Sequence, residues 1–335
     1  MVILTRRNDH IVSEIGISKK KIKKDFMMIR SKFVNLMLVF SCLSFSLSSM
    51  VNAEQNIQKQ ITTKVAAEIA KNNQDEWRTV AIENMVLLTL PHGKVVIELA
   101  PQFSPKHVEQ FMRLTKNGHY DGNKFYRVID GFVAQAGPED GSSLDSSVPL
   151  LKLEGEWPTD KNWLFTLVQK KDLFAEKTGF KDGFAVGHNP SENKAWLTHC
   201  PGIIAMARGN DANSGSSHFY ITNGQAPRYL DRIMSIFGRV VYGMNHVQAI
   251  TRSATIEGEA EVTSAAYTPI VSMQMMADVP SAEQIHLAVK NTESKLFATK
   301  LAERIKRDNA FFFKKPPPVL DVCQTPVLTR LLAHH

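Results

Sequence analysis

The chain has 335 residues, 43% of them hydrophobic, which is enough to bury a substantial core in one elaborated domain or in two. Its net charge of +7 would suit a nucleic-acid partner, but residues 1–53 hold nine Lys or Arg against three Asp or Glu and so contribute +6. The rest of the chain carries only +1, which argues against a nucleic-acid partner.

The first 53 residues have the pattern of a secretory leader. Arg30 and Lys32 precede an apolar stretch over residues 33–47, and Val51-Asn52-Ala53 is a small-residue cleavage site. We therefore expect cleavage after Ala53 and export of the mature chain to the periplasm.

The start and the fate of this leader leave alternatives open. A start at Met27 or Met28 would give a signal of ordinary length, so residues 1–26 are interpreted as a start-site artefact. The leader could persist as a membrane anchor, although its apolar stretch is Ser-rich and shorter than the roughly 20 residues of a spanning helix. It could also carry a lipid on Cys42, although Phe40 is bulky for a lipoprotein motif. After removal of the leader, no stable membrane span is expected.

Beyond the leader, the chain predicts a helical arm and then a strand-rich domain. Apolar residues at helical spacing between 55 and 72 predict a helix within an N-terminal arm over residues 54–80. The next expected elements are a hairpin of strands at 85–90 and 95–99 and a helix from Ser104-Pro105 to Gly118.

The stretch from Phe125 to Gly137 is the most informative part of the chain, because an arginine and a glutamine flank an apolar pair. In one continuous strand, Arg127 and Gln135 lie on one face and Phe132 on the other. Asp130-Gly131 is a turn signal that can shift this phase. A bulge or turn there would bring Arg127, Phe132 and Gln135 together over a common pocket.

This stretch resembles the active-site strand of the cyclophilins, which are peptidyl-prolyl cis/trans isomerases. A second motif at 202–208, followed by residues 215–221, is similar to the same family in the same order. The resemblance covers residues 85–251 and a last strand at 269–275. It implies a mainly β domain over residues 81–277, built as a closed eight-stranded antiparallel barrel capped by two helices.

Two regions depart from a minimal cyclophilin. The segment at about 138–200 is much longer than the usual connection, and we interpret it as an inserted lobe that is either functional or a surface excursion. Residues 278–335 form a C-terminal helical extension and tail, with a helix at 281–307. Cys200 and Cys323 could pair and pin this tail to the domain, or remain two separate buried thiols.

The resemblance also implies the site. Arg127 would stabilise the twisted imide of an X-Pro bond, and Phe132 would line a slot for the proline ring. Gln135 would orient Arg127 or bond the substrate backbone. No metal or cofactor is needed, because no bond is broken, and the partners are proline-containing polypeptides. The residues implied in substrate binding are Val133, Ala207, Arg208, His218, Tyr220, Tyr229, Leu230 and Met234.

Three of these positions differ from the best-known eukaryotic members. His218 stands where those proteins have glutamine, Tyr229 where they have tryptophan, and Met234 where they have histidine. The loss of an indole donor at Tyr229 should weaken binding of cyclosporin. The other two changes alter the pocket wall but leave Arg127 in place.

Structural roles are the alternative for several of these residues. Taken alone, Arg127 would be a surface ion-pair partner and Phe132 a core residue. Asp211-Ala212-Asn213 lacks the glycine and the terminal carboxylate of a calcium loop. His188 and His199 lack the spacing of metal ligands and are expected to be solvated or satisfied locally.

Two functions of different class remain. The first is a prolyl isomerase that assists the folding of exported proteins, which Arg127 and Gln135 favour. The second is a non-catalytic chaperone or protein-binding module of cyclophilin shape. The second function is favoured by the long insert, His218 and Met234.

Overall fold

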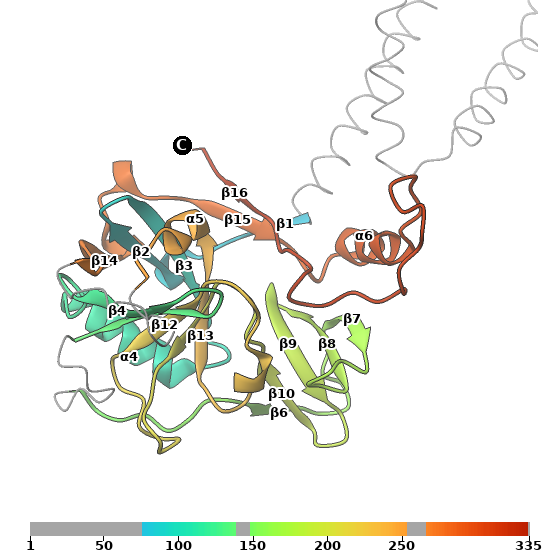
Figure 1. Cartoon of the computed structure of the whole chain (residues 1–335), viewed down its shortest axis with the longest axis horizontal. Helices are drawn as coiled ribbons and strands as arrows, with labels where there is room; N and C mark the ends of the chain where they lie inside the picture. Colours follow the sequence, from blue (N-terminus) through green and yellow to red (C-terminus); the bar gives the residue numbers. More distant parts are fainter. Residues whose placement is uncertain (1–75, 139–147, 253–265, 334–335) are drawn as a thin grey trace, which may run out of the picture. The chain divides into compact units, whose positions relative to one another are not determined.

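A computed structural model of the chain describes residues 76–138, 148–252 and 266–333 (Figure 1). The leader and the helix predicted over 55–72 lie outside these residues and remain predictions. The described part is mainly β and contains an eight-stranded main sheet, a five-stranded second sheet, a three-stranded sheet and few helices.

The main sheet is antiparallel throughout and has the order β14-β2-β3-β13-β11-β12-β5-β4. In β3, Val95, Val96 and Ile97 have branched side chains that favour extended backbone, and all three are buried because both faces of the sheet are covered. The strands are β2 (Met85–Leu90), β3 (Gly93–Leu99), β4 (Lys124–Ile129), β5 (Val133–Gly137), β11 (Ile203–Met206), β12 (Phe219–Thr222), β13 (Ile236–Tyr242) and β14 (Ser272–Met275).

The sheet curls but stays open, so the prediction of a closed barrel is wrong. Strands β4 and β14 are the two ends of the order, and among the described residues a single isolated bridge, Lys124 with Pro269, joins these ends. The neighbouring residues make this bridge, with the N–H of Phe125 donating to the carbonyl of Thr268 at 3.0 Å and the N–H of Ile270 donating to that of Asn123 at 2.7 Å. Strand β14 begins only at Ser272, so the bridge does not extend into a ladder between β4 and β14.

Two helices pack on the main sheet, as expected. Helix α4 (Pro105–Lys116) contacts β13 and β14 and buries Val108, Phe111 and Leu114, while α5 (Met244–Gln248) contacts β3. Burial of one such side chain stabilises the fold by about 1.5–3 kcal/mol. Phe111 is the centre of an aromatic cluster with Tyr120, Phe219 and Phe237.

The start of α4 is capped from outside the helix. Ser104 is the N-cap residue, but its hydroxyl donates to the carbonyl of Ile236 at 2.6 Å. The carboxylate of Glu154 instead accepts the backbone N–H groups of Lys106 and His107, at 3.1 and 3.0 Å, and contacts His107 Nδ1 at 2.7 Å. Residues after β5 therefore stabilise the helix that covers the main sheet.

The second sheet lies within the stretch interpreted as an insert. Its order is β6-β10-β9-β8-β7, and Phe180, Phe184 and Val186 share a hydrophobic cluster with Val133 and Tyr220 of the main sheet. That this region is an insertion into a smaller domain remains a prediction. The strands are β6 (Trp157–Pro158), β7 (Thr166–Lys170), β8 (Lys177–Lys181), β9 (Phe184–Asn189) and β10 (Lys194–Leu197).

A buried carboxylate ties the sheets together. Glu98 of β3 is 3% exposed and accepts hydrogen bonds from Arg239 of β13 and Arg78 of β1 (Trp77–Thr79). The same two guanidinium groups donate to the carbonyls of Gly183 and Asp182 in the turn between β8 and β9. Both cations and the anion thus satisfy one another where the three sheets meet.

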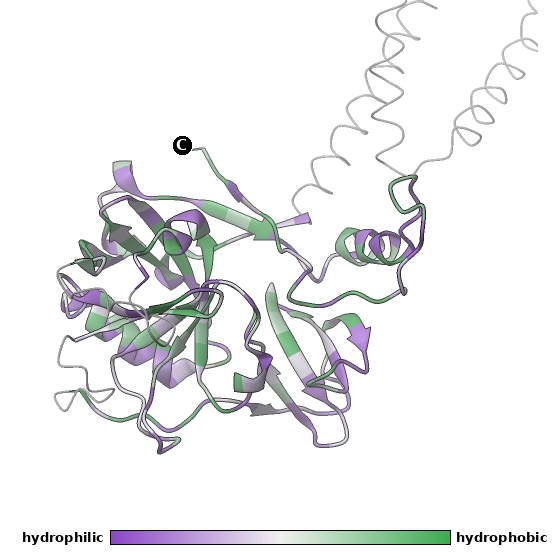
Figure 2. Ribbon diagram, in the orientation of Figure 1, coloured by the Kyte–Doolittle hydropathy of each residue, from purple (hydrophilic) through white to green (hydrophobic). Residues whose placement is uncertain are grey.

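The C-terminal region differs from its prediction. Helix α6 spans Lys295–Lys306 rather than 281–307, and β15 (Leu287–Lys290) pairs with β1 and with β16 (Thr329–Leu331). The hydroxyl of Ser294 accepts the N–H of Phe297 and so starts the helix. Hydrophobic and hydrophilic residues alternate along α6 (Figure 2).

A disulfide joins Cys200 to Cys323 and resolves the alternative left open for these cysteines. It links the segment before β11 to the C-terminal tail, so the tail is held against the second sheet, where Phe297 of α6 packs edge-on against Phe180.

The short helices of the described residues are η1 (Ile82–Asn84), η2 (Arg228–Leu230), η4 (Met276–Asp278) and η5 (Ser281–Glu283).

Candidate active site

The stretch that contains Arg127 forms a hairpin. Strands β4 and β5 are joined by a turn in which Gly131 has φ of +67°, a value that suits glycine, and the register pairs Arg127 with Gln135. Arg127 Nη1 donates to Gln135 Oε1 at 3.3 Å, and Arg127 Cζ lies 5.8 Å from the ring centroid of Phe132. The turn at Asp130-Gly131 therefore brings together the three residues of the predicted site.

Behind Arg127, a short network leads into the core. Gln135 Nε2 donates to the hydroxyl of Tyr126 at 2.6 Å, and that hydroxyl lies 2.8 Å from Nδ1 of His218, which is fully buried. Because the Tyr126 oxygen accepts from Gln135, its proton can be donated to His218. A Cβ on Gly137 would lie 2.5 Å from the His218 ring, so glycine is needed beside this histidine. The network fixes the amide that holds Arg127.

Tyr126 was not among the predicted site residues. Strict alternation along a strand would place it on the face opposite Arg127. The register shifts between Phe125 and Arg127, and this irregularity lets two neighbouring side chains both reach Gln135. A single sequence carries no clear signal for such a shift.

An apolar wall stands next to Arg127. The rings of Phe132 and Tyr229 stack with centroids 6.5 Å apart; Phe132 is half-buried and Tyr229 is exposed. Val133 is buried in β5, and Leu230 and Met234 are partly buried. The wall is thus apolar and partly open to solvent.

Ala207 and Arg208, two of the predicted substrate-binding residues, already have hydrogen-bond partners within the protein. Ala207 donates its N–H to the carbonyl of His218 at 2.8 Å, and the side chain of Arg208 donates to the carbonyls of Ile233 and Gly209. A substrate backbone would therefore have to use the carbonyl groups of this segment rather than the Ala207 N–H.

Tyr220 takes part in a buried polar network. Its hydroxyl lies 2.9 Å from Nε2 of His199, and His199 Nδ1 lies 3.0 Å from Oδ1 of Asp231, which also accepts the backbone N–H of His199. Burial, and then the nearby charge of Asp231, raise the pKa of the Tyr220 hydroxyl. Tyr220, a predicted substrate-binding residue, is thus held by His199. His199 was expected to be solvated or satisfied locally, and it is buried and satisfied locally.

The same network reaches the second sheet through Arg228, a residue that was not predicted. Arg228 is 5% exposed, and its Nε and Nη2 donate to Asp231 at 2.6 Å and to Asp172 at 3.0 Å. Trp196 Nε1 adds a contact of 3.3 Å to Asp231. This pairing of one buried cation with two carboxylates anchors η2, which carries Tyr229 and Leu230.

The other polar residues considered in the sequence have local partners. His188 contacts the hydroxyl of Thr159, and burial lowers its pKa. Asp211 Oδ1 accepts the N–H of Asn213 within a turn. Among residues 76–138, 148–252 and 266–333, no group of three His, Cys, Asp or Glu side chains is placed to hold a metal ion.

Comparison with known proteins gives the family. The cyclophilin type peptidyl-prolyl cis-trans isomerase family model matches residues 85–275. A probable peptidyl-prolyl cis-trans isomerase of Brucella suis is 31% identical over 181 residues, covering 53% of this chain and 76% of the relative. A peptidyl-prolyl cis-trans isomerase of Schizosaccharomyces pombe is 32% identical over 154 residues, covering 46% and 76%.

Among solved structures, the cyclophilin AquaCyp293 of Hirschia baltica is similar with a TM-score of 0.62 and 27% sequence identity, over 79% of this chain and 97% of that structure. The chain belongs to the cyclophilin family and is a peptidyl-prolyl cis-trans isomerase of that type.

In the part of the chain that the structure describes, no helix is both long and apolar enough to span a membrane.

Proposed function

We propose that Arg127 accelerates rotation about X-Pro bonds by stabilising the twisted imide, while Phe132 and its neighbours hold the proline ring. The planar imide has a barrier of about 18–20 kcal/mol, and uncatalysed rotation takes about 10–100 s. Millisecond turnover requires a reduction of about 5–7 kcal/mol, since each 1.4 kcal/mol changes the rate about tenfold. Arg127 is exposed beside the apolar wall, and its guanidinium is suited to this task because it is permanently charged and presents several donors.

The observation that carries this proposal is the position of Arg127. Its guanidinium lies over the Phe132 ring at 5.8 Å and is bonded to Gln135, which is in turn bonded to Tyr126. Twisting the imide gives the nitrogen an acceptor lone pair that the planar form lacks, so a donor already in place favours the twisted state.

The clients that we propose are proline-containing segments of exported polypeptides, and the place of action is the periplasm. This rests on the leader at residues 1–53 with its cleavage site at Ala53. Anchoring by the leader or by a lipid on Cys42 remains the alternative. Weak cyclosporin binding also belongs to this proposal, because Tyr229 lacks an indole donor.

The test compares isomerisation of a short X-Pro peptide by the parent, by Arg127→Ala and by Arg252→Ala. Arg252 is a matched control, because it pairs with Asp130 in the turn of the same hairpin. We expect Arg127→Ala to lose about 100-fold or more in kcat/KM, the loss typical of removing one preorganised donor, and Arg252→Ala to keep its activity. Equal activities of the parent and Arg127→Ala would refute the role of Arg127.

A further inference from the structure

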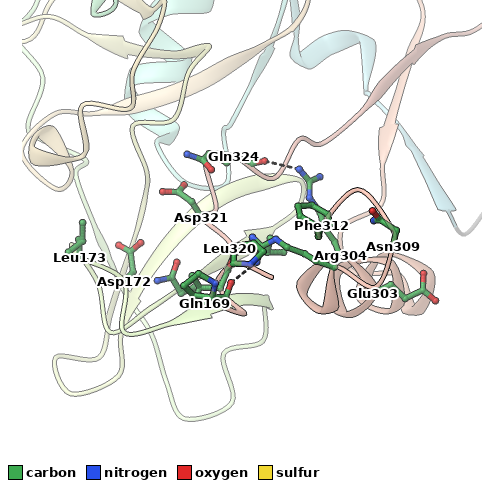
Figure 3. A pocket seen from close by; sticks show the side chains of 14 residues that line it. Gln169, Asp172, Leu173, Glu303, Arg304, Asn309, Phe312, Leu320, Asp321 and Gln324 are labelled. Atoms are coloured by element: carbon green, nitrogen blue, oxygen red, sulfur yellow. Dashed lines mark hydrogen bonds between the residues drawn. The ribbon is translucent and has the colours of Figure 1, made fainter. Parts of the chain in front are cut away.

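A pocket of about 680 Å³ lies between the second sheet and the C-terminal tail, and its lining includes none of Arg127, Phe132 and Gln135 (Figure 3). Gln169, Asp172 and Leu173 line it from the second sheet, and Arg304 and Phe312 line it from α6 and the tail. Its volume falls in the range of about 300–1,000 Å³ that is typical of ligand sites.

The rim of the pocket is unusually apolar for a surface. Leu173, Phe311, Phe313 and Val319 are 94%, 83%, 98% and 51% exposed, and each either lines the pocket or adjoins the lining residue Phe312. Exposed apolar side chains gathered around a hollow mark an interaction site rather than ordinary surface.

Most charged side chains that line the pocket already have hydrogen-bond or ion-pair partners within the protein. Arg307 donates to the carbonyls of Pro317 and Val319, and Arg304 donates to that of Gln324. Asp172 is paired with Arg228, and Asp321 accepts the N–H of Cys323. Glu303 lies on the exposed side of α6. Such a lining does not select an ionic ligand, whereas its amide groups and apolar stems suit a neutral polypeptide segment.

The tail wall of the pocket is fixed before anything binds. Cys323 stands between the lining residues Asp321 and Gln324 and is covalently bound to Cys200. Phe297 of α6 packs against Phe180 of the second sheet. A preformed wall lowers the entropy lost on binding.

The pocket is connected to the proposed isomerase site by direct contacts. Asp172 of its lining is bonded to Arg228, whose guanidinium also lies 5.2 Å from the ring centroid of Phe174. The next residue, Tyr229, stacks on Phe132. Exposed apolar side chains therefore lead from the proline wall toward the pocket.

We propose that this pocket binds an apolar segment of the same substrate polypeptide, at a distance along the chain from the X-Pro bond that is rotated. This inference rests on the proposed function, because it places the X-Pro bond at Arg127. The occupant is substrate because any polypeptide held at Phe132 continues beyond the proline, and the apolar strip gives it a path to the pocket. The pocket thereby adds a preference for long, partly unfolded chains over short peptides.

The test uses three peptides with the same X-Pro core: a tetrapeptide, a version extended by a Leu- and Phe-containing flank before the core, and a version extended by the same flank after it. Leu173→Asp combined with Val319→Asp changes two exposed residues that line the pocket, and Leu164→Asp is the matched control, since Leu164 is 79% exposed but does not line the pocket. We expect the rim variant to lose about 5- to 10-fold in kcat/KM for one extended peptide and to be unchanged for the tetrapeptide. The control should match the parent on all three peptides.

Unchanged kcat/KM of the rim variant on both extended peptides would overturn the proposal, as would a parent dimer that the rim variant abolishes, because the rim would then be covered by a second copy. Fluorescence anisotropy of a proline-free Leu- and Phe-rich peptide separates this proposal from the catalytic one. Binding that the rim variant loses and Arg127→Ala keeps supports the pocket even if the tetrapeptide is not isomerised. Absence of that binding in the parent counts against the pocket alone.

Discussion

Replacing His199 by leucine removes two buried hydrogen bonds beside the proposed isomerase site. The bond to Tyr220 is 2.9 Å long and the bond to Asp231 is 3.0 Å long, and His199 is fully buried. Leaving the Tyr220 hydroxyl without its partner costs about 1–3 kcal/mol, and losing the bond to a charged carboxylate costs about 1.5–3 kcal/mol. Because leucine fills a similar volume, we expect the free energy of unfolding to fall by about 3–5 kcal/mol.

The assay is urea unfolding of His199→Leu, Tyr220→Phe and the double variant at neutral pH. Tyr220→Phe removes the hydroxyl, so His199→Leu should cost about 1–2 kcal/mol less in that background. His92→Leu is the control, because His92 is exposed, and it should change the free energy by less than about 0.5 kcal/mol. Additive losses in the double variant, or a loss no larger than that of His92→Leu, would refute the coupling of His199 to Tyr220.

Two further changes test the contacts that join the parts of the fold. Glu154→Gln should lower the free energy of unfolding by about 1–2 kcal/mol, since the carboxylate caps α4. Burial of this carboxyl opposes a lower pKa, but the bonds from His107 and Lys106 outweigh it, so the folded pKa lies below 4.5. The stabilisation is therefore present above pH 4.5 and is lost as the pH falls through the lowered pKa, and urea unfolding across this range should show the parent and the variant converging. Cys323→Ser removes the disulfide between residues 123 positions apart and should lower the free energy of unfolding by on the order of 4–5 kcal/mol according to the chain-entropy relation. Thermal unfolding of this variant should no longer respond to reductant. A variant as stable as the oxidised parent would contradict this.

The strands and the hairpin of the site follow from local signals. Asp130-Gly131 marks the turn, and Gly131 takes the positive φ that such a turn requires. The family resemblance implied a closed barrel, whereas the two end strands meet in only one isolated bridge between Lys124 and Pro269, a long-range contact that no local pattern reveals.

The other differences have physical causes of the same kind. Ile285, Leu287 and Val289 alternate at a spacing of two, which indicates a strand, whereas the predicted helix at 281–307 joins them to Leu301 and Ile305. Tyr126, His199 and Arg228 owe their places to contacts between residues up to 92 positions apart, so only the folded chain brings them together.

The most direct test of Arg127 is its replacement by lysine, which keeps the positive charge but loses the planar fork. The measurement is the exchange rate between cis and trans forms of a short X-Pro peptide, followed by NMR with catalytic amounts of Arg127→Lys or the parent. We expect the lysine variant to lose at least about tenfold in kcat/KM while its thermal unfolding matches that of the parent. A lysine variant as active as the parent would contradict the proposal that a fixed guanidinium at this position stabilises the twisted imide.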